Sequence, residues 1–152
     1  MILKRLLVIS FLFALMACGL IGNYQNIYFY PVNTTNPSQS FKGTIYNLSG
    51  RIKLASSSGE EFNGELSSIS RPVDPSDSLY LNELRFQKNW DTVYGDNFYS
   101  INIIGSKRYS RGKLVGTSGG TAYIEIIRPN PNSNERLGVA IDSNRQLYKI
   151  TF

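Results

Sequence analysis

The sequence predicts an all-β protein, organised as a single antiparallel β-sandwich or a small barrel of short strands. Two observations lead to this prediction: apolar and polar residues alternate along most of the chain, and turn-forming residues separate the alternating segments. A length of 152 residues is that of one domain. Hydrophobic residues make up 41% of the chain and charged residues only 18%, which excludes a disordered chain rich in charge.

Several segments show the alternation that is typical of a strand with one buried face. We interpret residues 79–86 as a further strand, and no segment shows the pattern of a helix of four turns. The alternating residues predicted to face the core are Ile52 and Leu54; Phe62, Gly64 and Leu66; Tyr99, Ile101 and Ile103; Ala122, Ile124 and Ile126; Leu137, Val139 and Ile141; and Tyr148, Ile150 and Phe152.

Turn-forming residues separate these segments at residues 56–59, 71–78, 118–120, 129–134 and 142–145. The last of these turns is short enough to join its two strands as a tight hairpin. Short strands joined in this way predict an antiparallel meander that closes into a sandwich or a small barrel.

The first seventeen residues have the layout of a secretory signal peptide. Lys4 and Arg5 are positively charged, residues 6–16 are apolar apart from one serine, and the small residue Ala17 precedes Cys18, the only cysteine. The apolar run is too short to span a bilayer comfortably. These residues therefore predict an exported protein.

Leu15, Met16, Ala17 and Cys18 resemble the lipobox of bacterial lipoproteins. The resemblance implies that a diacylglycerol is joined to the sulfur of Cys18 and that the chain is cut just before it. In that family an aspartate directly after the cysteine favours the inner membrane. This chain has Gly19 there, so the resemblance implies the outer membrane, on its periplasmic face or its surface. An ordinary signal peptide with an incidental cysteine and a retained membrane helix are the alternatives.

We divide the chain accordingly into a signal peptide at residues 1–17, a lipidated cysteine and tether at 18–40, and a β domain at 41–152. The tether is rich in glycine, asparagine and proline, which disfavour regular structure. It includes one candidate strand, at residues 26–30.

The second half of the chain is also similar to small, uncharacterised envelope lipoproteins of Gram-negative bacteria. The similarity covers the glycine-rich hairpin at residues 112–121, the segments 137–140 and 142–144, and the final strand at 147–150. It implies a lipoprotein of the cell envelope and carries no activity with it.

Composition excludes several classes of function. The chain has no histidine and one cysteine, which excludes a zinc site of cysteine and histidine ligands, a Ser-His-Asp triad and an intrachain disulfide. We expect no metal and no cofactor. The formal net charge is +5, and two of these positive charges belong to Lys4 and Arg5 of the signal peptide. Nucleic acid is therefore not an expected partner.

Five residues are candidates for contact with a ligand or partner. Trp90 and Tyr94 lie in an aromatic segment that either stacks on a sugar ring or packs in the core. Lys107, Arg108 and Arg111 form a basic cluster that is either a solvated loop or a site for an anionic lipid or polyanion.

A cluster of carboxylates makes an enzymatic function one of the alternatives. Glu60, Glu61 and Glu65 have the chemistry for glycoside hydrolysis, although charges on the exposed face of a strand are the favoured explanation. We expect a non-enzymatic structural or interaction protein, anchored by lipid and associated with another envelope protein. The alternatives are a module that binds a glycan or small ligand, and a carboxylate-dependent hydrolase.

Overall fold

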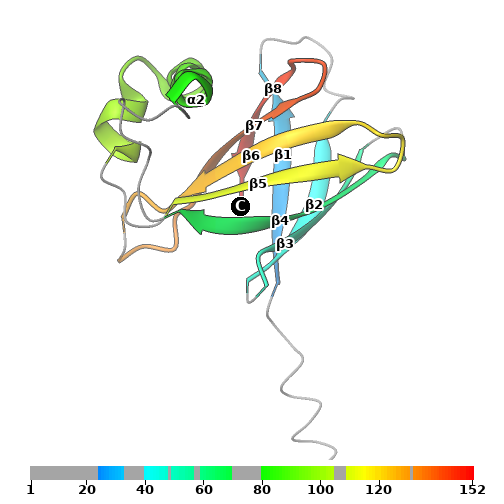
Figure 1. Ribbon diagram of the computed structural model, residues 1–152. Coiled ribbons are helices and arrows are strands. Elements are labelled where there is room, and N and C mark those ends of the chain that lie inside the picture. Colours follow the sequence, from blue (N-terminus) through cyan, green and yellow to red (C-terminus); the bar gives the residue numbers. More distant parts are fainter. Residues whose placement is uncertain are drawn as a thin grey trace, which may run out of the picture.

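The computed structural model describes residues 24–32, 40–47, 49–56, 59–69, 80–104, 109–130 and 132–152. The lipobox, Lys107 and Arg108 lie outside these residues. Within them, eight antiparallel strands form a closed barrel in which each strand pairs with the next along the chain (Figure 1). The prediction of an all-β small barrel is confirmed. The strands are β1 (Tyr24–Pro31), β2 (Phe41–Tyr46), β3 (Arg51–Ser56), β4 (Glu61–Ile69), β5 (Tyr109–Gly116), β6 (Thr121–Ile127), β7 (Leu137–Asp142) and β8 (Leu147–Thr151).

The first strand closes the barrel. β1 pairs with β2 on one side, where Tyr24 lies opposite Tyr46, and with β8 on the other, where Phe29 lies opposite Ile150. The candidate strand at residues 26–30 is therefore present. It belongs to the barrel, so the described part of the β domain includes Tyr24–Pro31 as well as the strands from residue 41 onward.

The barrel interior is filled by side chains from all eight strands. Alternation places Ile52, Leu54 and Ile150 in the core, as the sequence predicts, because successive residues of a strand point to opposite faces. Rings meet edge to face, with Phe41 5.5 Å from Phe62 and 5.4 Å from Tyr148 between ring centroids. The interior is therefore a packed core.

Glycines let neighbouring strands approach closely. A Cβ atom on Gly43 would collide with the backbone carbonyl of Lys53, and one on Gly64 would collide with that of Lys113. Both glycines stand at inward positions of their strands, two residues from Ile45 and Phe62 respectively, so the absence of a side chain allows the sheet to coil into a narrow barrel.

Two predicted strands are helical instead. Residues 80–94, which overlap the strand predicted at 79–86, form helix α2 (Tyr80–Tyr94), and Tyr99–Ile103 form a π-helical turn. The predictions of strands here, and of no helix of four turns, are wrong. Tyr99 and Ile103 are buried while Ile101 between them is 74% exposed, which is the spacing of one helix face and not of a strand.

The prediction for β7 has the wrong face. Gly138 pairs with Ile150 and Ala140 with Tyr148, whose side chains point inward, so Gly138 and Ala140 face the interior. Val139 points outward and is nevertheless buried. Both faces of this strand are covered, so alternation alone does not decide which residues face the barrel interior.

A second core lies outside the barrel. Helix α2 and the π-helical turn lie against one side of the barrel, at the left of Figure 1, and α2 contacts β7 and β8. The buried residues of this second core are Trp90, Tyr99, Ile103, Tyr109, Ile127 and Val139.

Among the described residues, no helix has both the length and the apolar character needed to cross a membrane.

Candidate functional site

The structure brings three of the predicted contact residues together between the helices and the barrel. Trp90 and Tyr94 lie on α2, and Arg111 lies on β5. The solvated loop predicted around Arg111 is therefore wrong for the described part of that cluster, because residues 109–113 belong to a paired strand.

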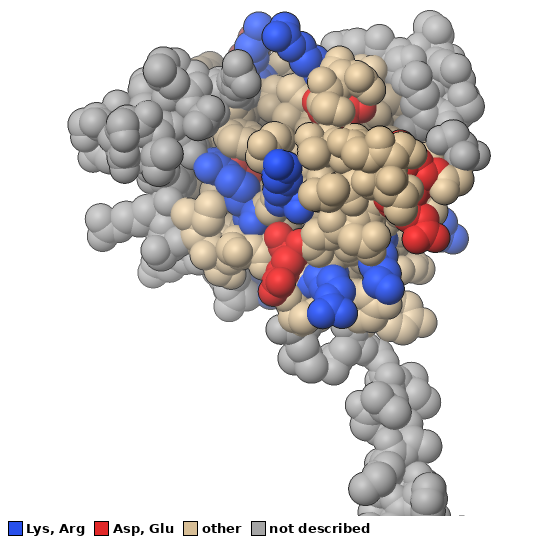
Figure 2. All heavy atoms as spheres, turned by 45° about the vertical axis from the view of Figure 1, so that its right-hand side comes forward, with Lys and Arg blue, Asp and Glu red and all other residues tan. Residues whose placement is uncertain are grey.

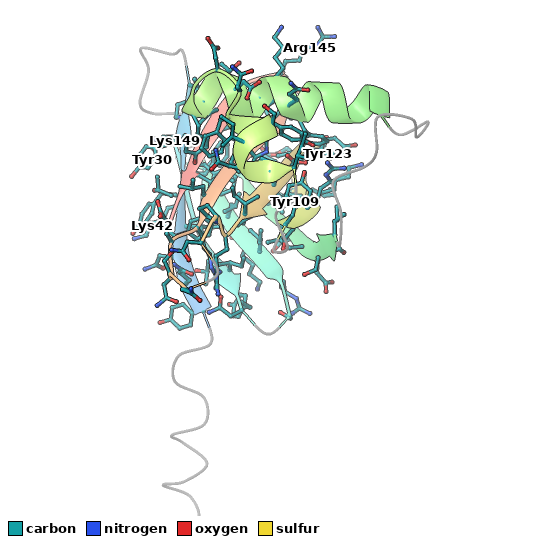
Figure 3. All side chains as sticks on the ribbon, turned by 90° about the vertical axis from the view of Figure 1, so that its left-hand side faces the viewer. Tyr30, Lys42, Tyr109, Tyr123, Arg145 and Lys149 are labelled. Atoms are coloured by element: carbon teal, nitrogen blue, oxygen red, sulfur yellow. The ribbon has the colours of Figure 1, made fainter. Side chains whose placement is uncertain are left out.

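Glu125 of β6 lies at the centre of this group and is fully buried. Its Oε2 accepts a 2.7 Å hydrogen bond from Nε1 of Trp90. Its Oε1 accepts hydrogen bonds from the hydroxyl of Tyr109 and from Nε of Arg111, the latter at 2.7 Å. Tyr109 lies below the helices (Figure 3). The carboxyl group therefore joins α2, β5 and β6.

Burial controls the protonation of this group. It raises the pKa of Glu125 to about 7, against the guanidinium of Arg111 and the three hydrogen bonds, which lower it. Burial, and then the nearby carboxylate, also raise the pKa of Tyr109. The phenol therefore remains a hydrogen-bond donor at neutral pH.

The aromatic residues of α2 pack on one another. The ring of Trp90 stacks on Tyr94 at 5.4 Å and on Phe98 at 5.8 Å between centroids, and it is completely buried. The hydroxyl of Tyr94 donates to the carbonyl of Gly138 at 3.1 Å and accepts from its N–H at 3.2 Å. Of the two roles weighed for Trp90, the structure has packing, since no ring face is open to a sugar.

Sequence reasoning missed Glu125 and Tyr109. The signal for Glu125 is its place as the one charged residue in the apolar run 124–127. A charge on the outward face of a strand is ordinarily solvated. A strand that is apolar on both faces, however, is normally covered by another element of the fold on its outer side, and such a cover would bury the charge as well.

An open cleft of about 430 Å³ lies at the end of the barrel where β1 begins. Its apolar lining includes Ile45, Leu66 and Ile126, which belong to the interior core or pack against it. Its rim is polar and includes Arg128 and Arg136. The volume is within the range of small-ligand sites.

Arg128 and Arg136 of this rim are close enough for their charges to interact. Arg136 donates a 3.2 Å hydrogen bond to Oδ1 of Asn47. Burial, and then the charge of Arg128, lower the pKa of Arg136. Among the residues that the structure describes, neither Arg128 nor Arg136 forms a salt bridge; the pair shown there joins Arg111 to Glu125. We did not predict this pair of arginines from the sequence. Its signal there is that Arg128 directly follows the strand β6 and Arg136 directly precedes the strand β7.

The carboxylates considered for an enzyme do not share a cleft. Glu61 and Glu65 are exposed on the outer face of β4, and Glu65 lies opposite Arg51 on β3 and Lys113 on β5. Glu60 Oε1 is buried and has no hydrogen-bond partner in the described structure. Glu61 and Glu65 are therefore arranged as charges on the outside of a sheet.

The surface in Figure 2 carries charges of both signs. Lys and Arg side chains appear at the top, at the centre left and at the lower end of the face in view, interspersed with Asp and Glu. Mixed charge of this kind favours solubility over broad attraction to a polyanion.

Comparison with protein-family models finds no match to this chain, and neither does comparison with curated proteins or with solved structures.

Proposed function

We propose that the chain is a lipid-anchored protein of the cell envelope, held at the outer membrane through Cys18, which works by binding rather than by catalysis. The observation that carries the proposal is the lipobox-like sequence Leu15, Met16, Ala17 and Cys18 placed just before a closed barrel that begins at Tyr24. Two or three acyl chains on one cysteine would hold such a domain firmly at a membrane.

The positions of the carboxylates support a binding role. A hydrolase of this type needs two carboxyl groups about 5–10 Å apart on either side of its substrate. Here Glu61 and Glu65 lie on the outer, convex face of the sheet, and Glu125 is sealed under α2. A packed barrel with one open end is instead suited to present that end to a partner.

The open cleft favours a small-ligand module as a second candidate. It combines an apolar floor with polar groups that converge from several loops, which is the usual construction of a binding site. An envelope protein that contacts the same end of the barrel is the partner expected under the first candidate.

Replacing the lipidated residue tests the anchor. We expect Cys18→Ser to release the protein from the membrane fraction, because the sulfur is the acyl acceptor. Gly19→Asp is the matched control, since it keeps the sulfur, and we expect it to remain membrane-bound while moving from the outer to the inner membrane. If the Cys18→Ser protein still sediments with membranes and is released only by detergent, the anchor is wrong.

A further inference from the structure

We propose that the cleft between Arg128 and Arg136 binds the phosphate group of an anionic phospholipid in the membrane that carries the anchor. The anion site follows from the cleft itself, whereas the choice of a membrane phospholipid as its source rests on the proposed function.

Strand register places Arg128 and Arg136 side by side at the end of the sheet. Ile127 at the end of β6 lies opposite Leu137 at the start of β7. Arg128 and Arg136 are the next residues outward on each strand, so they extend the same pair beyond the sheet. Both are half-buried. Two cations held together and partly desolvated repel each other, and an anion between them removes that repulsion.

The donors around the cleft suit a phosphate oxygen. A guanidinium presents N–H groups in a planar fork that matches a phosphate, and two forks can bind one phosphate from two sides. Asn47 accepts a hydrogen bond from Arg136 and so fixes its direction. The hydroxyls of Ser49 and Ser110 line the same cleft and supply further donors.

The packed interior limits the ligand to its head group. Ile45 and Ile126 form the floor of the cleft and are buried in the core. Towards the opposite end of the barrel, the space lined by Phe29, Phe62 and Tyr148 is only about 10 Å³, barely enough for one water molecule. The acyl chains of a bound lipid would therefore stay in the bilayer.

The position of the chain end brings the cleft to the membrane. Tyr24, the first residue of β1, lies opposite Tyr46, which lines the cleft. Cys18 precedes Tyr24 by six residues, a span of at most about 20 Å. A lipid on Cys18 would thus hold this end of the barrel within reach of phospholipid head groups, as β1 begins at the lower end in Figure 1.

Vesicle binding of a chain that begins at Gly19 tests the site without the acyl anchor. All eight strands and α2 lie after this point, so the barrel and its core are retained. We would measure co-sedimentation with vesicles of phosphatidylcholine alone, and with vesicles in which about one third is phosphatidylglycerol. A separate arm titrates inorganic phosphate and follows the amide resonances of residues around the cleft.

The test variant is Arg128→Gln with Arg136→Gln. The control is Lys113→Gln with Arg145→Gln, which removes the same charge from two exposed residues that do not line the cleft. General attraction of two basic residues to an anionic surface accounts for about a thirtyfold difference in binding, so we expect the test variant, which also loses the two guanidinium forks of the site, to bind phosphatidylglycerol vesicles more than about thirtyfold more weakly. The control should change binding by no more than about tenfold under the same conditions.

Three results would overturn the proposal. The first is no binding to phosphatidylglycerol vesicles, and the second is an equal loss in both double variants, which would indicate general charge attraction. The third is binding of inorganic phosphate in the cleft without binding to vesicles, which would leave an anion site and remove the phospholipid. None of these results depends on lipidation of Cys18, so failure here is distinguishable from failure of the anchor.

Discussion

Nε1 of Trp90 donates a 2.7 Å hydrogen bond to Oε2 of Glu125, and this contact joins helix α2 to the outer face of the barrel. Both side chains are completely buried. Residues 35 positions apart are thereby fixed across the second core. Because Trp90 is the only tryptophan, its fluorescence reports directly on the docking of α2.

Removal of this carboxyl group should undock the helix. We expect Glu125→Ala to lower the free energy of unfolding by about 3–5 kcal/mol, because it removes from the buried core the acceptor that Trp90, Tyr109 and Arg111 share. Glu125→Gln keeps the shape and one acceptor, so it should cost less. Urea titration followed by tryptophan fluorescence measures both. The exposed Glu65→Ala is the control, with a change within about 0.5 kcal/mol.

The raised pKa of Glu125 predicts a pH-dependent stability. Burial raises this pKa from 4.5 to about 7, so the folded protein holds the proton more tightly than the unfolded chain. The contribution of Glu125 to the free energy of unfolding should therefore be complete below pH 4.5. This contribution should fall as the pH rises towards about 7. The expected loss is at most about 3 kcal/mol. Urea titrations across this range should show the slope in the natural protein and not in Glu125→Gln; the same slope in both would assign it to other groups.

The last strand provides a test of the barrel register. Ile150 is fully buried against the interior core, while Lys149 is exposed with its ammonium 5.1 Å from the ring centre of Tyr94. We expect Ile150→Ala to cost about 2–5 kcal/mol and Lys149→Ala no more than about 1 kcal/mol in urea titration. Equal costs at the two positions would contradict the assignment of inward and outward faces.

The inward glycines provide a test of barrel closure. A Cβ on Gly64 would collide with the carbonyl of Lys113 on the neighbouring strand, so we expect Gly64→Ala to cost about 1–3 kcal/mol. The neighbouring Asn63→Ala, whose side chain is exposed on the outer face, should change stability by about 0.5 kcal/mol or less. Thermal unfolding of the two variants would reveal the difference. An unchanged melting temperature for Gly64→Ala would mean that these strands lie further apart.

Much of the barrel follows from local pattern. Alternation in β3, β6 and β8 selects the correct inward residues, because each of these strands presents a consistent apolar face to one core. The hairpin at residues 142–145 also forms, with Arg145 at a φ of 65° in its turn. Closure by β1 could not be derived, since nothing local in the tether identifies which strands it pairs with.

The helical layer was missed for a different reason. Phe86, Trp90, Val93 and Tyr94 recur at helical spacing and pack on the second core. The strand predicted at residues 79–86 separates Phe86 from this pattern, and Trp90 and Tyr94 alone fit either sugar stacking or core packing. Tyr99 and Ile103 fit both a strand and a helix over so short a segment. When the helix is not known, the sequence predicts that Glu125 is an exposed charge on a strand. The site could therefore not be predicted until the element that covers it was known.

The mass of the intact mature protein, purified from bacterial membranes, tests the central claim most directly. We predict a chain that begins at Cys18 and carries a diacylglycerol on its sulfur, with a further acyl group where the host adds one to the amino terminus. A membrane-derived chain that begins at another residue, or one that begins at Cys18 and carries no lipid, would contradict it.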